Sequence, residues 1–223
     1  GTSQTASDLP VLFYSRRIGL SGSHEVPIWG GGRVTGRMGR YQVGLVDMET
    51  KTDSGIRATN FSVVRVKRDI LRKSTIGVLA TNRTVAQSLP GSNQAYGVDG
   101  TFGFFSNLTF ATYLARTQSS GVKSGDLSYR TQMEYAGDRY GVQLERLSID
   151  PNFNPEVGFV RRSNNVQYSA DVAWNPLIRR SAAIRNLKFA ESYDYYQNAL
   201  SRQFETRSYE TTAGVQLENN GSL

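Results

Sequence analysis

Two pairs of carboxylates have a spacing that could support acid–base chemistry. Asp150 and Glu156 flank the segment "PNFNP", and Glu134 and Glu145 lie on the two arms of one predicted hairpin. Two carboxylates on either side of a glycosidic bond can hydrolyse it, one as the acid and the other as the base or nucleophile. Glu134 and Glu145, however, lie beside basic residues such as Arg130, and this mixture is more typical of a water-lined polar face. The sequence therefore predicts no catalytic residue and a protein that is not an enzyme.

Other chemical motifs are scarce. The chain has no cysteine, and its single histidine, His24, lies in the loop sequence "LSGSHEVP", so a zinc site would need several carboxylates beside it. The stretch "GGGRVTGRMG" lacks the lysine and the spacing of a phosphate-binding loop, and there is no Gly-x-Ser-x-Gly nucleophile elbow. We therefore expect no metal and no cofactor.

One loop, "IDPNFNPEVGFVRR", concentrates residues that could bind a ligand. Pro151 and Pro155 stiffen it, and its asparagines favour turns. The same polar groups, together with an aromatic ring, could contact a sugar at the mouth of a barrel or fold inward as a constriction. The structural interpretation is favoured, because turn-forming residues are expected in any loop. The candidate ligand-binding residues of this loop are Asp150, Asn152, Phe153, Asn154, Glu156 and Arg161.

The elements that would position these residues are β-strands, and one hairpin shows the pattern most clearly. In "DLSYRTQMEYAGDRYGVQLERLSI", apolar and polar residues alternate on both sides of the tight turn "AGDR". We expect the apolar face to point outwards on a convex surface: Leu127, Tyr129, Met133, Tyr135, Tyr140, Val142 and Leu144. We expect the polar face to point into a concave interior: Ser128, Arg130, Gln132, Glu134, Gln143 and Glu145.

The same pattern repeats along the chain, and no amphipathic helix of three turns interrupts it. A single helical turn fits the region 175–184. The predicted strands are 11–19, 33–38, 41–50, 59–69, 74–82, 96–104, 108–116, 127–136, 140–149, 157–163, 166–174, 185–197 and 202–217.

The connections between these strands alternate strictly between short turns and longer loops. Such alternation is typical of an up-and-down outer-membrane barrel, whereas a Greek-key sandwich gives no reason for it. The predicted turns lie near 39–40, 70–73, 105–107, 137–139, 164–165 and 198–201, and the loops at 20–32, 51–58, 83–95, 117–126, 150–156 and 175–184. We therefore predict an all-β fold: an antiparallel up-and-down transmembrane β-barrel of outer-membrane type.

Composition agrees with this fold class. Hydrophobic residues make up 38% of the 223 residues, and no stretch approaches the run of about 20 apolar residues that a membrane helix needs. The formal net charge is +7, but the basic residues are scattered, so nucleic acid is not an expected partner. Predicted strands of about 9–11 residues match the length that crosses a bilayer at a tilt.

The apolar face of these strands would contact either lipid or a protein core. Aromatic residues cluster near predicted strand ends, as in the girdles of membrane barrels: Tyr129 with Tyr135, Phe102 with Phe104, and Tyr168 with Trp174. These positions favour lipid and a location in the cell outer membrane. A soluble all-β protein remains the alternative, because alternation alone does not distinguish inward from outward.

Six separated motifs carry a resemblance to a bacterial family: "LFYSRRIGL", "PIWGGGRVTGRMGRYQVGL", "TNFSVVRVKRDIL", "STIGVLATNR", "YGVDGTF" and "NFNPEVGFVRR". In order, they span residues 11 to 162. They resemble the uncharacterised β-barrel domain that follows a family-9-like carbohydrate-binding module in large exported proteins of Gram-negative bacteria. The resemblance implies an outer-membrane barrel whose partners include a carbohydrate-binding domain or a glycan ligand. It implies no reaction.

The chain departs from this family in lacking the carbohydrate-binding module and in ending on "LENNGSL" without a terminal aromatic residue. Thirteen predicted strands is also an odd number, whereas bacterial single-chain barrels use even ones. We therefore expect 1–10 to be a polar lead-in and 11–223 to be the amino-terminal portion of a longer barrel. Such a portion would form an open, curled sheet with two free edges.

Three functions fit the sequence. In the first, the barrel is a conduit or translocator linked to glycan handling, and inward Arg33, Arg37 and Arg130 bias it towards anionic solutes. In the second, it is a membrane anchor that holds a carbohydrate-binding domain and has a plugged lumen. In the third, it is a soluble all-β carbohydrate-binding or hydrolase-associated module. The first two have outer-membrane lipid as a partner.

Overall fold

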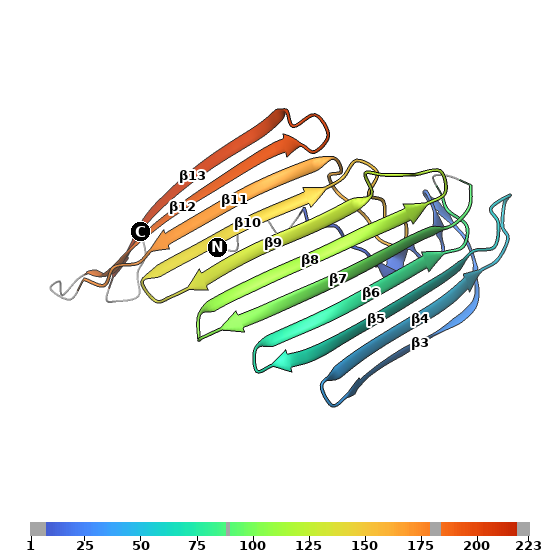
Figure 1. Cartoon of the computed structure of the whole chain (residues 1–223), viewed down its shortest axis with the longest axis horizontal. Helices are drawn as coiled ribbons and strands as arrows, with labels where there is room; N and C mark the ends of the chain where they lie inside the picture. Colours follow the sequence, from blue (N-terminus) through green and yellow to red (C-terminus); the bar gives the residue numbers. More distant parts are fainter. Residues whose placement is uncertain (1–7, 88–89, 179–183, 218–223) are drawn as a thin grey trace.

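The computed structural model describes residues 8–87, 90–178 and 184–217. These residues form one curled antiparallel sheet of eleven strands in which every strand pairs with its neighbour in sequence (Figure 1). The strands are β3 (Ile28–Met38), β4 (Tyr41–Thr50), β5 (Asn60–Leu71), β6 (Ser74–Arg83), β7 (Asn93–Phe104), β8 (Leu108–Ser119), β9 (Leu127–Ala136), β10 (Tyr140–Ile149), β11 (Asn165–Trp174), β12 (Ile184–Asn198) and β13 (Phe204–Leu217). A separate hairpin consists of β1 (Leu20–Ser21) and β2 (His24–Glu25).

The all-β, antiparallel, up-and-down fold is thus confirmed. Within the described ranges the only helical element is a single 3-10 turn at Ser15–Arg17. None of the described residues forms a helix of the length and apolarity needed to cross a membrane.

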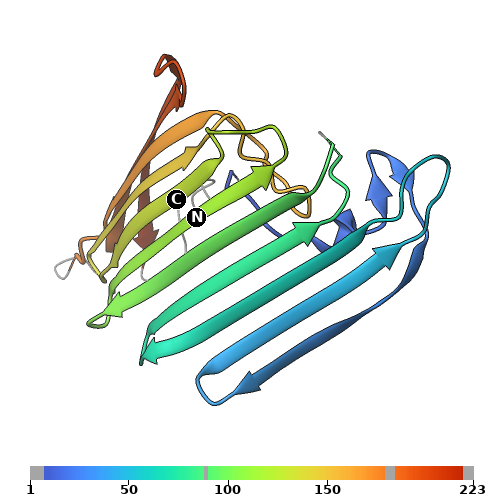
Figure 2. The same cartoon turned by 45° about the vertical axis from the view of Figure 1, so that its right-hand side comes forward.

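The sheet is not closed. Strands β3 and β13 are its two edges, and neither pairs with a further strand among the described residues (Figure 1). Figure 2 shows the sheet curling from β3 to β13, so that it has a convex and a concave side. Residues 8–19 and the β10–β11 loop, residues 150–164, lie on the concave side. Closure into a barrel remains a prediction.

Two predicted strands, 11–19 and 157–163, are wrong. In residues 8–19 the apolar side chains are consecutive, as in "LPVLF", so that no single face of a strand could take them all. The segment instead spreads them over two core clusters. Its contacts with the β10–β11 loop include an isolated bridge between Val11 and Phe159. Residues 157–163 therefore belong to an inward-folded loop and to no sheet strand.

The remaining predicted strands are present, with shifted ends. The predicted strand 33–38 begins five residues earlier, at Ile28. The strict alternation of short and long connections holds as far as β11 and then fails, because residues 175–183 join β11 to β12 at the end of the sheet where the short turns lie. The predicted helical turn in 175–184 is absent from residues 175–178, and 179–183 fall outside the described residues.

The short turns explain how the hairpins reverse. A two-residue connection at Gly39–Arg40 joins β3 to β4, and Gly39 has a φ of +59°, a conformation that glycine adopts without steric cost. The "turn end" of the sheet is defined here by this turn and by those at 72–73, 105–107 and 137–139. The opposite, "loop end" carries residues 51–59, 84–92, 120–126 and 150–164.

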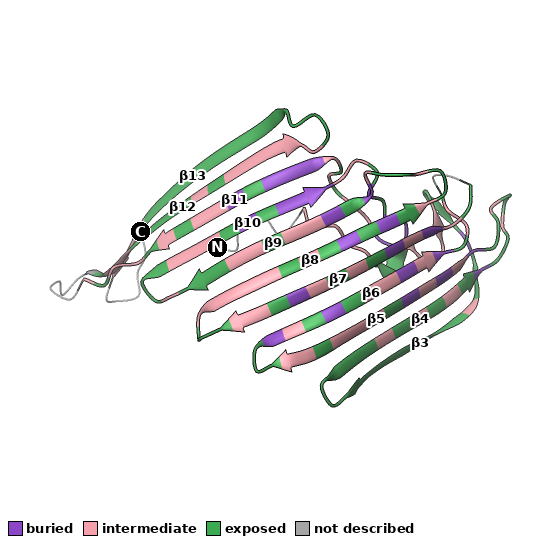
Figure 3. Cartoon of the chain, in the orientation of Figure 1, coloured by how far each residue is buried: buried purple, intermediate pink, exposed green. Residues whose placement is uncertain are grey.

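Buried residues gather at the loop end of β5 to β11, beneath residues 8–19 and 150–164 (Figure 3). The first core cluster consists of Ala115, Leu147, Ile149 and Phe153, with Leu9, Leu12, Tyr113 and Val160 packed against it. The second consists of Phe61, Val63 and Val157, with Phe13, Ile18, Val46 and Leu79 packed against it. The core therefore lies between the concave face and the two segments that cover it.

The face assignment of the hairpin β9–β10 follows from its register. Met133 pairs with Leu144 and Tyr135 pairs with Val142, whereas Gln132 pairs with Glu145. The first set lies on the convex face, and Leu144 is 44% exposed there. The second set shares its face with Leu147 and Ile149, which the core covers. The apolar residues thus point outwards and the polar ones inwards, as predicted.

Candidate functional site

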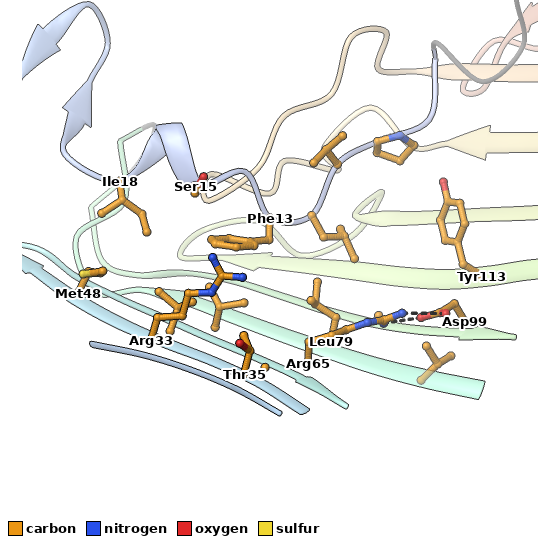
Figure 4. Close-up of a pocket in the computed structure, with 18 of the residues that line it drawn as sticks. Phe13, Ser15, Ile18, Arg33, Thr35, Met48, Arg65, Leu79, Asp99 and Tyr113 are labelled. Atoms are coloured by element: carbon orange, nitrogen blue, oxygen red, sulfur yellow. Dashed lines mark hydrogen bonds and ion pairs between the residues drawn. The ribbon is translucent and has the colours of Figure 1, made fainter. Parts of the chain in front are cut away.

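A cavity lies on the concave side, between residues 10–18 and the inner face of β3 to β8 (Figure 4). Its volume is about 710 Å³. Apolar side chains make up much of its lining: Val11, Leu12, Phe13, Ile18, Ile28, Val46, Met48, Val63 and Leu79. The strands supply the floor, and the amino-terminal segment supplies the roof.

Charged groups line two parts of this cavity. Arg65 and Asp99 form a two-pronged ion pair, with the Arg65 guanidinium donating to both carboxylate oxygens of Asp99 at 2.5 and 2.9 Å (Figure 4). A Cβ at Gly77 would lie 2.8 Å from the Arg65 guanidinium, so the glycine leaves the space that this pair occupies. Arg33 extends from β3 towards Phe13 (Figure 4), and no hydrogen bond or ion pair joins it to another described residue.

The amino-terminal segment is fixed to the β10–β11 loop by backbone hydrogen bonds. Val11 and Phe159 exchange two, with N···O distances of 2.9 and 2.8 Å, and the N–H of Tyr14 donates to the carbonyl of Val157 at 2.9 Å. The fit is close: a Cβ at Gly97 would lie 2.7 Å from a methyl carbon of Leu12. The segment is therefore a packed inward-folded element.

The β10–β11 loop is held by a buried polar network. The backbone N–H of Gln87 donates to Glu156 Oε2 at 2.7 Å, and Arg83 Nε lies 3.7 Å from the same oxygen. The backbone N–H of Glu156 donates to Asn93 Oδ1 at 3.0 Å. Asn93 also donates through Nδ2 to the carbonyl oxygen of Asn154 at 2.9 Å. The backbone N–H of Asn154 in turn donates to the hydroxyl of Thr117 at 3.0 Å. Glu156 and Asn154 thus tie the loop to β6, β7 and β8.

The other candidate residues of this loop have separate surroundings. Phe153 is 2% exposed and belongs to the first core cluster, so its ring is not open to a ligand from solvent. Asp150 accepts a hydrogen bond from the N–H of Leu127 at 3.2 Å, and Asn152 donates to the carbonyl of Ser124 at 2.8 Å. Arg161 is exposed. The structure brings the loop candidates together as a packed element rather than as a ring around a ligand.

A second, more polar cavity of about 490 Å³ lies beside this loop. Asn152, Asn154 and Glu156 line it together with Arg17 and Gln87. Phe153 is also part of the lining, so four of the ten candidate site residues meet at the wall of this cavity.

The candidate residues on the strands differ in whether they form an ion pair. Arg130 donates to Glu145 at 2.6 Å, and their side chains are 16% and 0% exposed. Arg37 donates to Asp69 at 2.8 Å, near the turn end. Glu134 is exposed at the end of β9. Of the three arginines expected to attract anions, Arg37 and Arg130 are thus paired with carboxylates, and Arg33 alone has no acidic partner among the described residues.

Metal-binding geometry is absent from the described residues. His24 contacts Asp53 at 3.0 Å in an exposed loop pair. The residues that the structure describes contain no group of three or more His, Cys, Asp or Glu side chains able to hold a metal ion. Glu145, one of the four carboxylates with a suggestive spacing, is engaged by Arg130, and Asp150 and Glu156 serve the loop.

Of the residues that line the cavity of about 710 Å³, only Arg33 is among the candidates predicted from the sequence. Leu12, Phe13 and Ile18 lie in residues 11–19, which the sequence pattern predicts to be a strand. The inward apolar residue Val63 lies in "NFSVVRVKRDI", whose alternation is blurred. The blurred alternation is the signal in the sequence that the inward face of this strand is also covered, because a strand with apolar residues on both faces is usually buried on both.

Comparisons with known proteins add no relative. No family model matches the chain, and no curated protein and no solved structure matches it. The resemblance to the bacterial barrel domain therefore remains a prediction from the sequence motifs.

Proposed function

We propose that this chain forms the wall of an outer-membrane β-barrel and acts as a narrowed conduit. The observation that carries the proposal is the largely apolar convex face of β4 to β11. Many of its outward positions hold apolar residues or threonine: Val43, Leu45, Val64, Val66, Ile76, Val78, Ala80, Val98, Thr112, Leu114, Thr131, Met133, Val142, Leu144, Ala170 and Val172. The charged residues on the same face lie within the last four residues of their strands: Asp47, Glu49, Arg68, Arg116 and Arg146. An apolar band of this kind is the surface that lipid-facing strands present.

Aromatic residues border this band at both ends. At the turn end, Tyr140 pairs with Trp174, whose ring stacks on Phe189 with centroids 5.6 Å apart. At the loop end, Tyr168 pairs with Arg146, whose guanidinium carbon lies 5.4 Å from the ring centroid. Aromatic side chains prefer the boundary between hydrocarbon and headgroups because each ring has an apolar body and, in Tyr and Trp, a polar tip. The two borders support a band that spans a membrane.

The concave face supports the same orientation. Its charged residues near the sheet centre are held in ion pairs, Arg65 with Asp99 and Arg130 with Glu145. A charge on the lipid face near the bilayer midplane would cost about 2–4 kcal/mol for Arg or Lys. Inward placement avoids this cost, since partners and water are available inside a barrel.

The interior is narrowed at the loop end by residues 8–19 and 150–164, and the cavity of about 710 Å³ lies beside them. A conduit of this form passes small solutes rather than polymers. The proposed conduit has no general preference for anions, because Arg37 and Arg130 are neutralised by carboxylates. A link to glycan handling rests on the family resemblance alone and adds nothing to the proposal.

A membrane anchor with a plugged lumen is the second candidate, and the packing of residues 8–19 favours it. Two core clusters and the backbone bonds between Val11 and Phe159 fix this segment over the concave face. Conductance of the full-length protein in planar bilayers separates the candidates. A steady current supports the conduit, and electrical silence supports the anchor.

The membrane assignment itself is tested by two substitutions on neighbouring residues of β10. Leu144→Arg places a charge on the convex band, and we expect it to reduce the free energy of folding into lipid vesicles by about 2–4 kcal/mol. Gln143→Arg places the same charge on the concave face, opposite Glu134 on β9 and Asp171 on β11. We expect the second variant to fold within about 1 kcal/mol of the parent. Equal effects of the two would exclude lipid contact at Leu144.

A further inference from the structure

The cavity under residues 10–18 is unusual for the inside of a membrane barrel, because its walls are largely apolar. Val46, Met48 and Leu79 line it from β4 and β6, where water or polar groups would be expected. Met48 and Leu79 are labelled in Figure 4. Phe13 and Ile18 face them from the covering segment. An apolar wall that faces an open space favours an apolar occupant, since burying apolar surface is worth about 25 cal/mol per Å².

Arg33 gives this apolar space one charged corner. Its side chain extends into the gap between β3 and Phe13 (Figure 4), and it has no acidic partner among the described residues. Arg37, four residues along the same strand and on the same face, is paired with Asp69. The other guanidinium in the cavity, that of Arg65, is already bound by Asp99. Arg33 is therefore the cation that remains for a ligand.

We propose that the cavity binds a single-chain amphiphile with a carboxylate head, of the kind that a fatty acid represents. The chain lies against Val46, Met48 and Leu79, and the carboxylate accepts hydrogen bonds from the Arg33 guanidinium, whose planar fork matches a carboxylate. The volume of about 710 Å³ falls in the range of small-molecule sites, roughly 300–1,000 Å³.

A polar ligand such as a sugar fits the same walls poorly. Each hydroxyl that it turned towards Val46 or Leu79 would lose its hydrogen bonds to water and gain none. The hydroxyl-bearing residues of the lining, Ser15, Thr35 and Tyr113, are spread over three elements rather than gathered on one side. The proposal deepens the proposed conduit by naming the class of its cargo, and it rests on that function only in this respect.

Photo-crosslinking of the full-length protein tests the binding. The probe is a fatty acid that carries a diazirine in its chain, and the readout is the labelled peptides found by mass spectrometry. We expect saturable labelling of the peptides that contain residues 10–18 and Met48. The matching fatty acid without the diazirine competes, and the corresponding fatty alcohol competes at least about tenfold more weakly, because it lacks the charge that Arg33 binds.

Two variants make the result specific. Arg33→Ala removes the preference for acid over alcohol, and Arg37→Ala, on the same strand and face, keeps it. Leu79→Trp fills the cavity and abolishes labelling of residues 10–18. The proposal is overturned if acid and alcohol compete equally in the parent protein, if labelling of these peptides does not saturate, or if Arg37→Ala has the same effect as Arg33→Ala.

The outcome is independent of the membrane assignment. Labelling of the cavity needs neither conductance nor a lipid-facing surface, and the comparison of Leu144→Arg with Gln143→Arg needs no ligand. If the cavity is not labelled but the two arginine variants of β10 differ, the ligand proposal has failed. If the cavity is labelled but these variants behave alike, the membrane assignment has failed.

Discussion

Leu144 and Leu147 lie three residues apart on β10, yet they meet different surroundings. Leu144 is 44% exposed on the convex face, and Leu147 is fully buried on the concave one. The strand alone does not make this difference, since its alternation only separates two faces. The burial comes from residues 8–19 and 150–164, which cover the concave face at the loop end. A curled sheet therefore acquires its inside from segments that lie outside its strands.

Charged residues on the concave face also differ between the covered and the uncovered part of the sheet. The largest loss of unfolding free energy is expected for the buried ion pair. Glu145→Ala would leave the Arg130 guanidinium without its carboxylate in a site where the two side chains are 16% and 0% exposed. Removal of one partner of a buried ion pair costs about 3–5 kcal/mol. Denaturant unfolding of the refolded protein measures it.

Glu134→Ala is the matched control, because Glu134 lies on the same face of β9 but is exposed near the turn end. We expect its effect to remain below about 0.5 kcal/mol. Comparable losses for the two variants would mean that the concave face is not closed over Arg130.

The two leucines give the next largest effect. Leu147→Ala removes a side chain from the first core cluster, and truncations of this kind cost about 2–5 kcal/mol. Leu144→Ala removes the same atoms from the convex face, where no protein core surrounds them, and we expect a loss of less than about 1 kcal/mol. Denaturant unfolding curves of the two variants measure both losses of unfolding free energy. A larger loss for Leu144→Ala than for Leu147→Ala would mean that the convex face is the inside of the protein.

The contact between the covering segments predicts a smaller effect. A Cβ at Gly158 would overlap the carbonyl oxygen of Val11 and lie 2.7 Å from the carbonyl carbon of Leu12, so Gly158→Ala forces residues 8–19 and the loop apart. We expect a loss of about 1–3 kcal/mol, as for overpacking, and faster proteolysis within residues 8–19. Gly36→Ala on β3 serves as the control, since nothing lies within 4 Å of a Cβ there. Unchanged proteolysis of the Gly158 variant would contradict a packed segment.

The smallest effect is expected for the exposed ion pair. The Arg37 side chain is 63% exposed where it contacts Asp69, and pairs of this kind contribute about 0–1 kcal/mol. Arg37→Ala should therefore leave the unfolding free energy almost unchanged, in contrast to Glu145→Ala. A loss of 3 kcal/mol or more, as estimated for buried pairs, would show that the turn end of the concave face is also covered.

The sequence predicted the sheet well because the pattern with a period of two repeats in each hairpin. Met133, Tyr135 and Leu144 could be assigned to one face and Arg130, Gln132 and Glu145 to the other without any structure. The prediction failed where the apolar residues are consecutive. Leu12 and Phe13 serve different core clusters, and a short apolar run does not distinguish a strand from a segment packed on a sheet.

The candidate site was harder to predict for a related reason. Asn152, Asn154 and Glu156 have side chains suited to binding a ligand, and the same side chains can also fix a loop. Glu156 meets the backbone of Gln87, 69 residues earlier in the chain, and only the fold brings these two together. Arg33 could be proposed from its type and its face, but its lack of a partner became visible only when Arg37 and Arg130 were seen to have theirs.

Site-directed spin labelling tests the central assignment of the two faces most directly. The chain contains no cysteine, so single cysteines can be placed at Gln132, Met133, Val142, Gln143 and Leu144 and labelled in vesicles. We predict that labels at Met133, Val142 and Leu144 are relaxed by oxygen, which concentrates in lipid, and are shielded from a water-soluble nickel chelate. Labels at Gln132 and Gln143 should show the reverse. Equal access of the nickel chelate to both sets, or shielding of the outward set from both reagents, would contradict a lipid-facing convex surface.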